Sequence, residues 1–141
     1  MTLWVIDASV VIKWYVPEGN YEAARAMRNA ETALAVPDLF FAETANILWK
    51  TVRRGEMIGS RAIEIIEEVA AAPFITISNQ SLAQDALDLS IATGMTAYDA
   101  TYVALAIRLD KILITADEKL MRKVAGTRSA NHVTRLADYT N

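Results

Sequence analysis

The segment MTLWVIDASVVIKWYV, residues 1–16, places one acidic residue between two runs of large apolar side chains. Residues 3–6 form a short apolar run that is typical of a strand buried on both faces. Asp7 interrupts the apolar pattern, and a short helix is predicted over residues 8–15, before Pro17. A carboxylate so close to the core must accept hydrogen bonds, take up a proton or bind a cation.

The rest of the chain alternates short apolar runs with helical patterns. Further strands are predicted at 34–36, 74–77 and 112–115, with a short fifth strand near His132 and Val133. Helices are predicted over 21–29, 38–54, 60–71, 81–92, 96–109 and 117–124, the second of them with Asp38 as its N-cap. This alternation predicts an α/β domain with a mostly parallel sheet and leaves the strand order open.

Length and composition predict one globular domain over residues 1–141. The chain is 53% hydrophobic and 22% charged, and it has no cysteine, which excludes disulfides and cysteine-based zinc sites. The apolar N-terminus lacks a basic leader and contains Asp7, so a signal peptide is not expected. The longest uncharged stretch is too short and polar to span a bilayer. We therefore expect a soluble, cytoplasmic protein without a membrane partner.

Two acids follow predicted strands. Asp7 comes after the first strand and Asp117 after the fourth, and ligands of parallel α/β sheets bind at these carboxyl ends. Ser9 and Thr115 each stand two residues from one of these acids. Their hydroxyls suit hydrogen bonds to the carboxylates or to water on a metal ion, although ordinary helix-start hydroxyls explain them as well.

Two further acids stand on predicted helix faces. Asp99 shares the core-facing stripe of its helix with Tyr102 and Val103. Glu43 stands near Phe40 on a helix that is apolar nearly all round, so its face is expected to be at least partly buried.

Each acid also has a separate structural explanation. Asp7 and Asp117 suit helix N-caps, Asp99 suits a capping box with Thr96, and Glu43 favours the first turns of its helix through the helix dipole. If the acids are only structural, four independent explanations must all be true at once. One shared acidic site explains all four together and is the preferred interpretation. Such a cluster suits hard divalent cations, above all Mg²⁺, which promote phosphodiester hydrolysis.

Four segments carry a resemblance to a known family. In this order and at this spacing, VIDASVVIKW, PDLFFAETANIL, TAYDATYVALA and LITADEKL resemble the PIN-domain ribonucleases, and most of all the VapC-type toxins of toxin–antitoxin pairs. The resemblance implies a three-layer α/β/α domain with a central sheet of four to five strands. It also implies an endoribonuclease that depends on Mg²⁺ or Mn²⁺, forms a homodimer and is neutralised by a small antitoxin.

The resemblance assigns roles to individual residues. Catalysis and metal binding fall to the four acids Asp7, Glu43, Asp99 and Asp117. Supporting roles fall to Ser9, Asn46 and Thr115.

The distribution of charge is compatible with an RNA substrate. The net charge is −3, but without the four candidate acids the chain has 14 basic and 13 acidic residues. Residues 119–135 contain no acid, and RNA contacts are expected from Lys119, Arg122 and Lys123, with Arg128 and Arg135 further along. A second basic cluster comprises Lys50, Arg53, Arg54 and Arg61. For any single one of these residues, a solvated helix face is the alternative.

Most of the aromatic residues are expected to lie in the core, and the one histidine is expected to be structural. Trp49 shares an apolar stripe with Ala42, Ala45 and Val52 and is assigned to the core. His132 lies beyond the motifs and is expected at the surface or in a satisfied structural role.

Other functions were weighed against the nuclease. A catalytically silent PIN-like module that binds RNA or protein is the main alternative, but it has little use for a costly acid cluster. A phospho-acceptor receiver domain needs an aspartate after the third strand, and FITISNQ has none. A P-loop nucleotide hydrolase is excluded because its glycine-rich phosphate-binding motif does not occur.

Overall fold

The computed structural model describes residues 1–139, and its centre is a five-stranded parallel sheet with the order β3-β2-β1-β4-β5. The strands are β1 (Thr2–Ile6), β2 (Thr32–Pro37), β3 (Ile75–Ile77), β4 (Leu113–Thr115) and β5 (Val133–Arg135). All five lie at the positions that the apolar runs predict, because short runs of β-branched and aliphatic residues suit strands covered on both faces.

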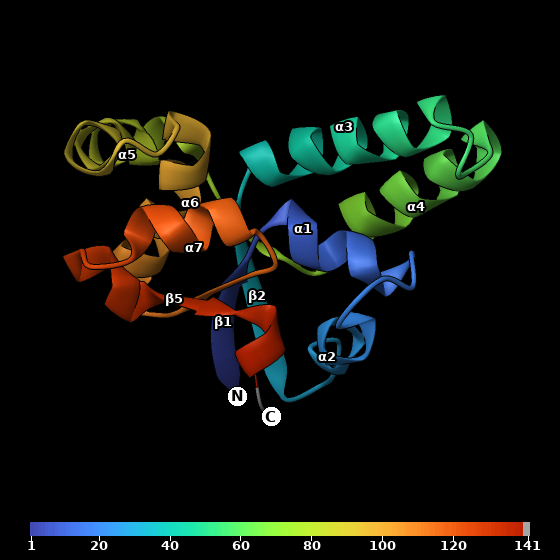
Figure 1. Cartoon of the computed structure of the whole chain (residues 1–141). Coiled ribbons are helices and arrows are strands. Elements are labelled where there is room, and N and C mark those ends of the chain that lie inside the picture. Colours follow the sequence, from blue (N-terminus) through green and yellow to red (C-terminus); the bar gives the residue numbers. More distant parts are fainter. Residues whose placement is uncertain (140–141) are drawn as a thin grey trace.

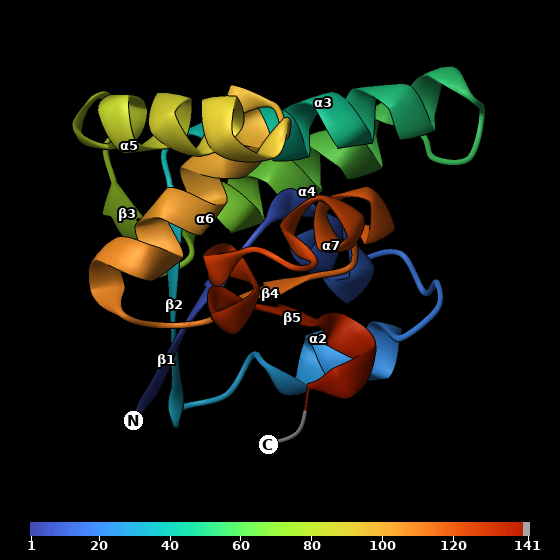
Figure 2. The same ribbon diagram turned by 60° about the vertical axis from the view of Figure 1, so that its left-hand side comes forward.

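Helices cover both faces of the sheet. They are α1 (Ala8–Val11), α2 (Tyr21–Ala26), α3 (Leu39–Arg53), α4 (Gly59–Ala71), α5 (Asn79–Thr93), α6 (Ala97–Leu109) and α7 (Glu118–Val124). In Figure 1, where the sheet is seen nearly edge-on, α5, α6 and α7 lie to its left and α1, α2 and α4 to its right. Figure 2 shows α3 and α4 running side by side and joined by a tight turn. The predicted three-layer α/β/α fold is confirmed.

The strand order follows from right-handed crossovers. The chain moves from β1 to β2 to β3 in one direction, with α1 to α4 on one face, and then returns through α5 and α6 to β4 on the other side of β1. The direction of winding therefore reverses between β1 and β4. In parallel α/β sheets, ligands bind at the carboxyl edge beside this reversal.

The core consists of the two sheet faces and the helix stripes that pack on them. Val5 and Ile6 of β1 are fully buried, as are Leu113 and Ile114 of β4. On α6, the stripe that includes Tyr102, Val103 and Ala106 is buried as predicted.

Three local predictions need correction. The helix predicted over 8–15 is the short α1 followed by the 3₁₀ turn Ile12–Trp14. Asp38 precedes α3, but its side chain does not cap that helix; its carboxylate accepts a hydrogen bond from the Asn79 backbone N–H at 3.1 Å instead. Trp49 is 54% exposed and not in the core, because α3 presents Leu48 and Thr51 to its neighbours.

The structure places His132 in a structural role. Its Nδ1 lies 2.9 Å from the backbone carbonyl oxygen of Lys111, beside the start of β4. Among residues 1–139, no helix is both long and apolar enough to cross a membrane.

Candidate active site

The four acids predicted from the sequence come from four elements that begin or end at the carboxyl edge of the sheet. Asp7 follows β1, Asp117 follows β4, Glu43 lies in the second turn of α3, and Asp99 lies in the first turn of α6. Figure 1 shows α1 and α3 both starting at this upper end of the strands. β1 and β4 are paired through Ile6 and Ile114, so the residues that follow them lie side by side.

Asp7 is held by two hydroxyl groups. The Ser9 hydroxyl donates a hydrogen bond to Oδ1, and the Thr115 hydroxyl donates one to Oδ2. The Ser9 backbone N–H also donates to Oδ1, at 3.1 Å. Ser9 Oγ accepts from the Ala116 N–H at 3.0 Å, and Thr115 Oγ1 accepts from the Asp117 N–H at 3.0 Å. These hydroxyls therefore fix Asp7 and tie the end of β1 to the end of β4.

Burial makes the charge on Asp7 costly. Its side chain is 7% exposed, and loss of hydration raises its pKa from 3.8 to about 6. The Ser9 and Thr115 hydrogen bonds oppose this rise, while the charges of Asp117 and Glu43 add to it. Near neutral pH the Asp7 carboxylate is ionised and is repelled by the neighbouring acids. A cation bound beside it would therefore stabilise its charge.

Glu43 has a buried hydrogen-bond partner, Tyr102, which was predicted only as a core residue. The Tyr102 hydroxyl donates a hydrogen bond of 2.5 Å to Glu43 Oε1 and links α6 to α3 across the site. Burial raises the pKa of Glu43, the Tyr102 hydrogen bond lowers it, and the charges of Asp99 and Asp117 raise it. The pKa of the Tyr102 hydroxyl is raised by burial and by Glu43, so Tyr102 stays a neutral donor. The only sequence signal for this role was its place on the stripe of Asp99.

The helix-capping explanations hold for two acids. Asp7 caps α1 through its bond to the Ser9 N–H, and Asp117 caps α7 by accepting from the N–H groups of Lys119 and Leu120 at 2.9 and 3.3 Å. For Asp99, the half of the predicted capping box that Thr96 supplies is present, because the Thr96 hydroxyl accepts from the Asp99 N–H at 3.1 Å. An acid can cap a helix and also belong to the shared site, because the helices begin at the same edge of the sheet where the acids lie.

The charges of the four acids act on one another. Burial raises the pKa of Asp99, and the charge of Asp117 raises it further. Asp117 also acts on Asp7 and Glu43, and Glu43 acts on Asp7. The four carboxylates therefore form one electrostatically coupled group, the acid cluster.

The donor chemistry of the acid cluster suits a hard divalent cation. Every candidate ligand is an oxygen, and Asp7 Oδ2, which accepts one hydrogen bond, keeps a free lone pair, whereas Oδ1 accepts from both the hydroxyl and the backbone N–H of Ser9. Within residues 1–139, no three His, Cys, Asp or Glu side chains converge tightly enough to enclose an ion by themselves. Mg²⁺ is commonly held by one or two carboxylates while it keeps several waters, so the open arrangement fits that ion.

The basic residues of α7 are available for contacts with a ligand. Lys119, Arg122 and Lys123 are exposed, and none of them forms an ion pair within the described part of the chain. We call these three the α7 basic face. By contrast, Arg135 pairs with Glu118 at 3.1 Å.

In the second predicted basic cluster, two arginines already have acidic partners. Arg54 pairs with Glu56 at 3.1 Å, and Arg61 pairs with Glu64 at 3.2 Å.

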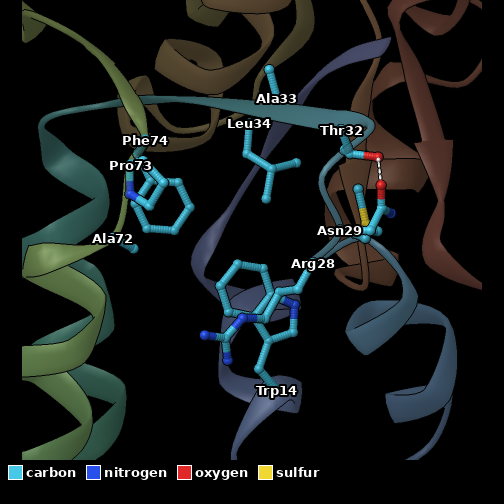
Figure 3. Close-up of a pocket in the computed structure, with 10 residues that line it drawn as sticks. Trp14, Arg28, Asn29, Thr32, Ala33, Leu34, Ala72, Pro73 and Phe74 are labelled. Carbon is cyan, nitrogen blue, oxygen red and sulfur yellow. Dashed lines mark hydrogen bonds between the residues drawn. The ribbon is translucent and has the colours of Figure 1, made fainter. Parts of the chain in front are cut away.

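A separate cavity of about 290 Å³ opens at the opposite, amino-terminal end of β2 (Figure 3). Trp14 and Phe74 form two of its walls with nearly parallel rings 6.0 Å apart. The Arg28 guanidinium covers the Trp14 ring at 4.9 Å and pairs with Glu68 at 3.2 Å. No acid lines this cavity, and its cation is already paired, so the chemistry of the molecule is concentrated at the acid cluster.

The fold and the acid cluster define a class of protein, and comparison with known families agrees with it. The model of the PIN domain matches residues 4–126 of this chain. The chain therefore belongs to the PIN-domain family. Within this family it is of the VapC type. It is 38% identical over 122 residues to Ribonuclease VapC3 from Pyrobaculum aerophilum, a match that covers 84% of this chain and 92% of that protein.

Solved structures share the fold. PAE2754 from Pyrobaculum aerophilum aligns with a TM-score of 0.70 and 24% identity, over 96% of this chain and 85% of that one. The toxin–antitoxin complex from Klebsiella pneumoniae contains a chain that aligns with a TM-score of 0.61 and 17% identity, over 96% of this chain and 98% of that one. The family resemblance predicted from the four sequence segments is confirmed.

Proposed function

We propose that this chain is a metal-dependent endoribonuclease and the toxin of a VapBC-type toxin–antitoxin pair. The observation that carries the proposal is the acid cluster, in which four elements bring coupled, partly buried carboxylates to the carboxyl edge of the sheet. Membership of the PIN-domain family and the identity to a VapC ribonuclease support it. Because its substrate is cellular RNA, we place the protein in the cytoplasm.

In this proposal the acids hold Mg²⁺ or Mn²⁺, and the other residues hold the acids. Asp7, Glu43, Asp99 and Asp117 supply the carboxylate oxygens. Ser9 and Thr115 fix the orientation of Asp7, and Tyr102 fixes that of Glu43. A divalent ion at such a site lowers the pKa of water and offsets the charge that develops on a phosphodiester during hydrolysis.

The α7 basic face is placed to hold the RNA backbone. α7 begins immediately after Asp117, so its exposed cations lie within a few turns of the acid cluster. Phosphate contacts from Lys and Arg supply affinity and position without reading the sequence.

A groove between α3 and α4 supports an antitoxin partner. Its volume is about 350 Å³ and its lining is almost wholly apolar. Two large side chains of the groove face solvent, Trp49 with 54% and Ile63 with 58% of their surface exposed. An amphipathic segment laid into such a groove buries apolar surface on both partners. A homodimer is expected as well, and sedimentation velocity of the free chain measures it.

RNA cleavage by the purified chain tests the proposal. A linear RNA and a circular RNA of the same sequence are incubated with Mg²⁺, with Mn²⁺ and with EDTA, using Asp7→Asn as the inactive variant. Asp88→Asn, an exposed aspartate on α5, is the matched control. We expect both RNAs to be cut only with metal, by the unmodified chain and by the control.

Three other outcomes each contradict part of the proposal. Cleavage of the linear RNA alone would indicate an exonuclease, because a circle offers no end. Cleavage that persists in EDTA or in Asp7→Asn would remove the acid cluster from the reaction. No cleavage and no Mn²⁺ binding by calorimetry would favour the catalytically silent binding module.

A further inference from the structure

A second groove adjoins the acid cluster on the side of α3. Its volume is about 400 Å³, and Glu43 belongs to its lining. The other lining residues come from the same face of α3 and from the start of α6: Leu39, Ala42, Asn46, Ile47, Lys50 and Tyr98. The groove therefore combines apolar walls with one amide, one ammonium group and one aromatic ring. A volume of this size holds one small ligand or one unit of a longer polymer.

Two polar side chains of this groove, Asn46 and Lys50, have no partner within the described residues, whereas Glu43 accepts the Tyr102 hydrogen bond. Among residues 1–139, the side chains of Asn46 and Lys50 form no hydrogen bond or ion pair, and the Tyr98 ring packs on no other aromatic ring. Tyr98 is 66% exposed. Its position contrasts with that of Tyr102, one turn further along α6, whose hydroxyl is buried against Glu43.

We infer that this groove is a nucleotide subsite of the RNA-cleaving centre, in which the Tyr98 ring stacks on an unpaired base and the Lys50 ammonium holds a backbone phosphate. The inference rests on the proposed ribonuclease function. Many proteins bind single-stranded RNA with exposed aromatic rings that lie next to cations. The rings stack on the faces of the bases, and the cations contact the backbone phosphates. The Asn46 amide, between Glu43 and Lys50 on the helix, offers a donor and an acceptor to the edge of that base.

The spacing along α3 supports a bound strand. Glu43 and Lys50 are two helical turns apart on one face, which corresponds to about 10 Å at a rise of about 1.5 Å per residue. Each strand of double-stranded DNA carries one phosphate per about 3.4 Å of helix axis, and an unpaired strand spaces its phosphates further apart, so this distance spans three nucleotides at most. A strand cut at the acid cluster therefore extends along α3 within reach of Tyr98 and Lys50.

The charge and polarity of the groove favour RNA over a protein segment. The groove between α3 and α4 is almost wholly apolar, as a protein helix requires, whereas this one carries Lys50 and Asn46 with their hydrogen-bonding capacity unmet. A phosphate satisfies the ammonium group, and a base edge satisfies the amide.

The experiment measures cleavage of a short single-stranded RNA in Mn²⁺ and its binding by fluorescence anisotropy in EDTA. The substrates are the normal RNA and a series in which each position in turn is abasic. Tyr98→Ala is expected to lower kcat/KM by about 5- to 100-fold, mainly through KM, and Tyr98→Phe to recover most of this loss because it keeps the ring. Ile91→Ala, which truncates an exposed apolar side chain on α5, is the control.

Two results identify the subsite directly. The defect of Tyr98→Ala should vanish with the RNA that lacks the one stacked base, and Lys50→Gln should reduce the slope of log affinity against log salt by about 0.7. An equal defect on every abasic RNA, or wild-type kcat/KM in Tyr98→Ala, would overturn the inference. A changed sedimentation coefficient with normal cleavage would show that Tyr98 serves a protein interface.

The binding arm separates this inference from the proposed function. If the unmodified chain binds the RNA more tightly than Tyr98→Ala does but cuts nothing in Mn²⁺, the ribonuclease proposal fails and the subsite stands. If the unmodified chain neither binds nor cuts RNA, both fail.

Discussion

Asp7 should make the metal-free protein less stable as the pH rises. Its pKa is about 6 in the folded chain and 3.8 as a free side chain, so between these values the folded state binds more protons than the unfolded state. The free energy of unfolding therefore falls with increasing pH across this window. The difference between the two pKa values corresponds to about 3 kcal/mol in total. Below the window the carboxyl is neutral in both states, and above it the full destabilisation is present.

Urea unfolding in EDTA at a series of pH values, for the unmodified chain and for Asp7→Asn, measures this effect. The Asn side chain still bonds the Ser9 and Thr115 hydroxyls, which rotate to suit it, so the variant removes the charge and keeps the contacts. The difference in unfolding free energy between the two proteins should shift by about 2 kcal/mol in favour of Asp7→Asn from about pH 4 to about pH 7. Mn²⁺ should raise the free energy of unfolding of the unmodified chain but not that of Asp7→Asn, because only the unmodified chain keeps the Asp7 carboxylate. Parallel pH curves in EDTA would refute the reasoning, because Asp7 would then carry no buried charge.

Three further changes test other parts of the site. Tyr102→Phe removes the hydrogen bond to Glu43, and a hydrogen bond to a charged partner contributes about 1.5 to 3 kcal/mol. Calorimetry should therefore show Mn²⁺ binding weakened about 10- to 100-fold. The control Tyr21→Phe, on α2, should bind Mn²⁺ as the unmodified chain does. Asp99→Asn relieves repulsion from Asp117 and removes a partly buried charge, so it should raise the melting temperature in EDTA while weakening Mn²⁺ binding; an unchanged or lower melting temperature contradicts the cluster. Replacing all three residues of the α7 basic face by Gln should reduce the salt slope of RNA affinity by about 2, and an unchanged slope would place the RNA elsewhere.

The fold was predictable because its signals are local. Each strand is a short apolar run, and each of the first four is followed by at least one helix with its own start and stop residues, so the alternation in residues 1–139 defines an α/β protein. Local signals failed where a tertiary contact competed with them. Asp38 has the chemistry of an N-cap but bonds the Asn79 N–H, and the Trp49 side chain faces solvent at the edge of the groove between α3 and α4.

The candidate acids can be predicted from the chain order, because Asp7 and Asp117 follow strands and Asp99 shares a buried stripe. How those acids are held depends on tertiary contacts. Asp7 and Thr115 are 108 residues apart, and Glu43 and Tyr102 are 59 apart, so the bonds between them depend on which strands pair and which helices pack. The reversal of winding between β1 and β4 creates this edge, since it brings the ends of two distant strands side by side.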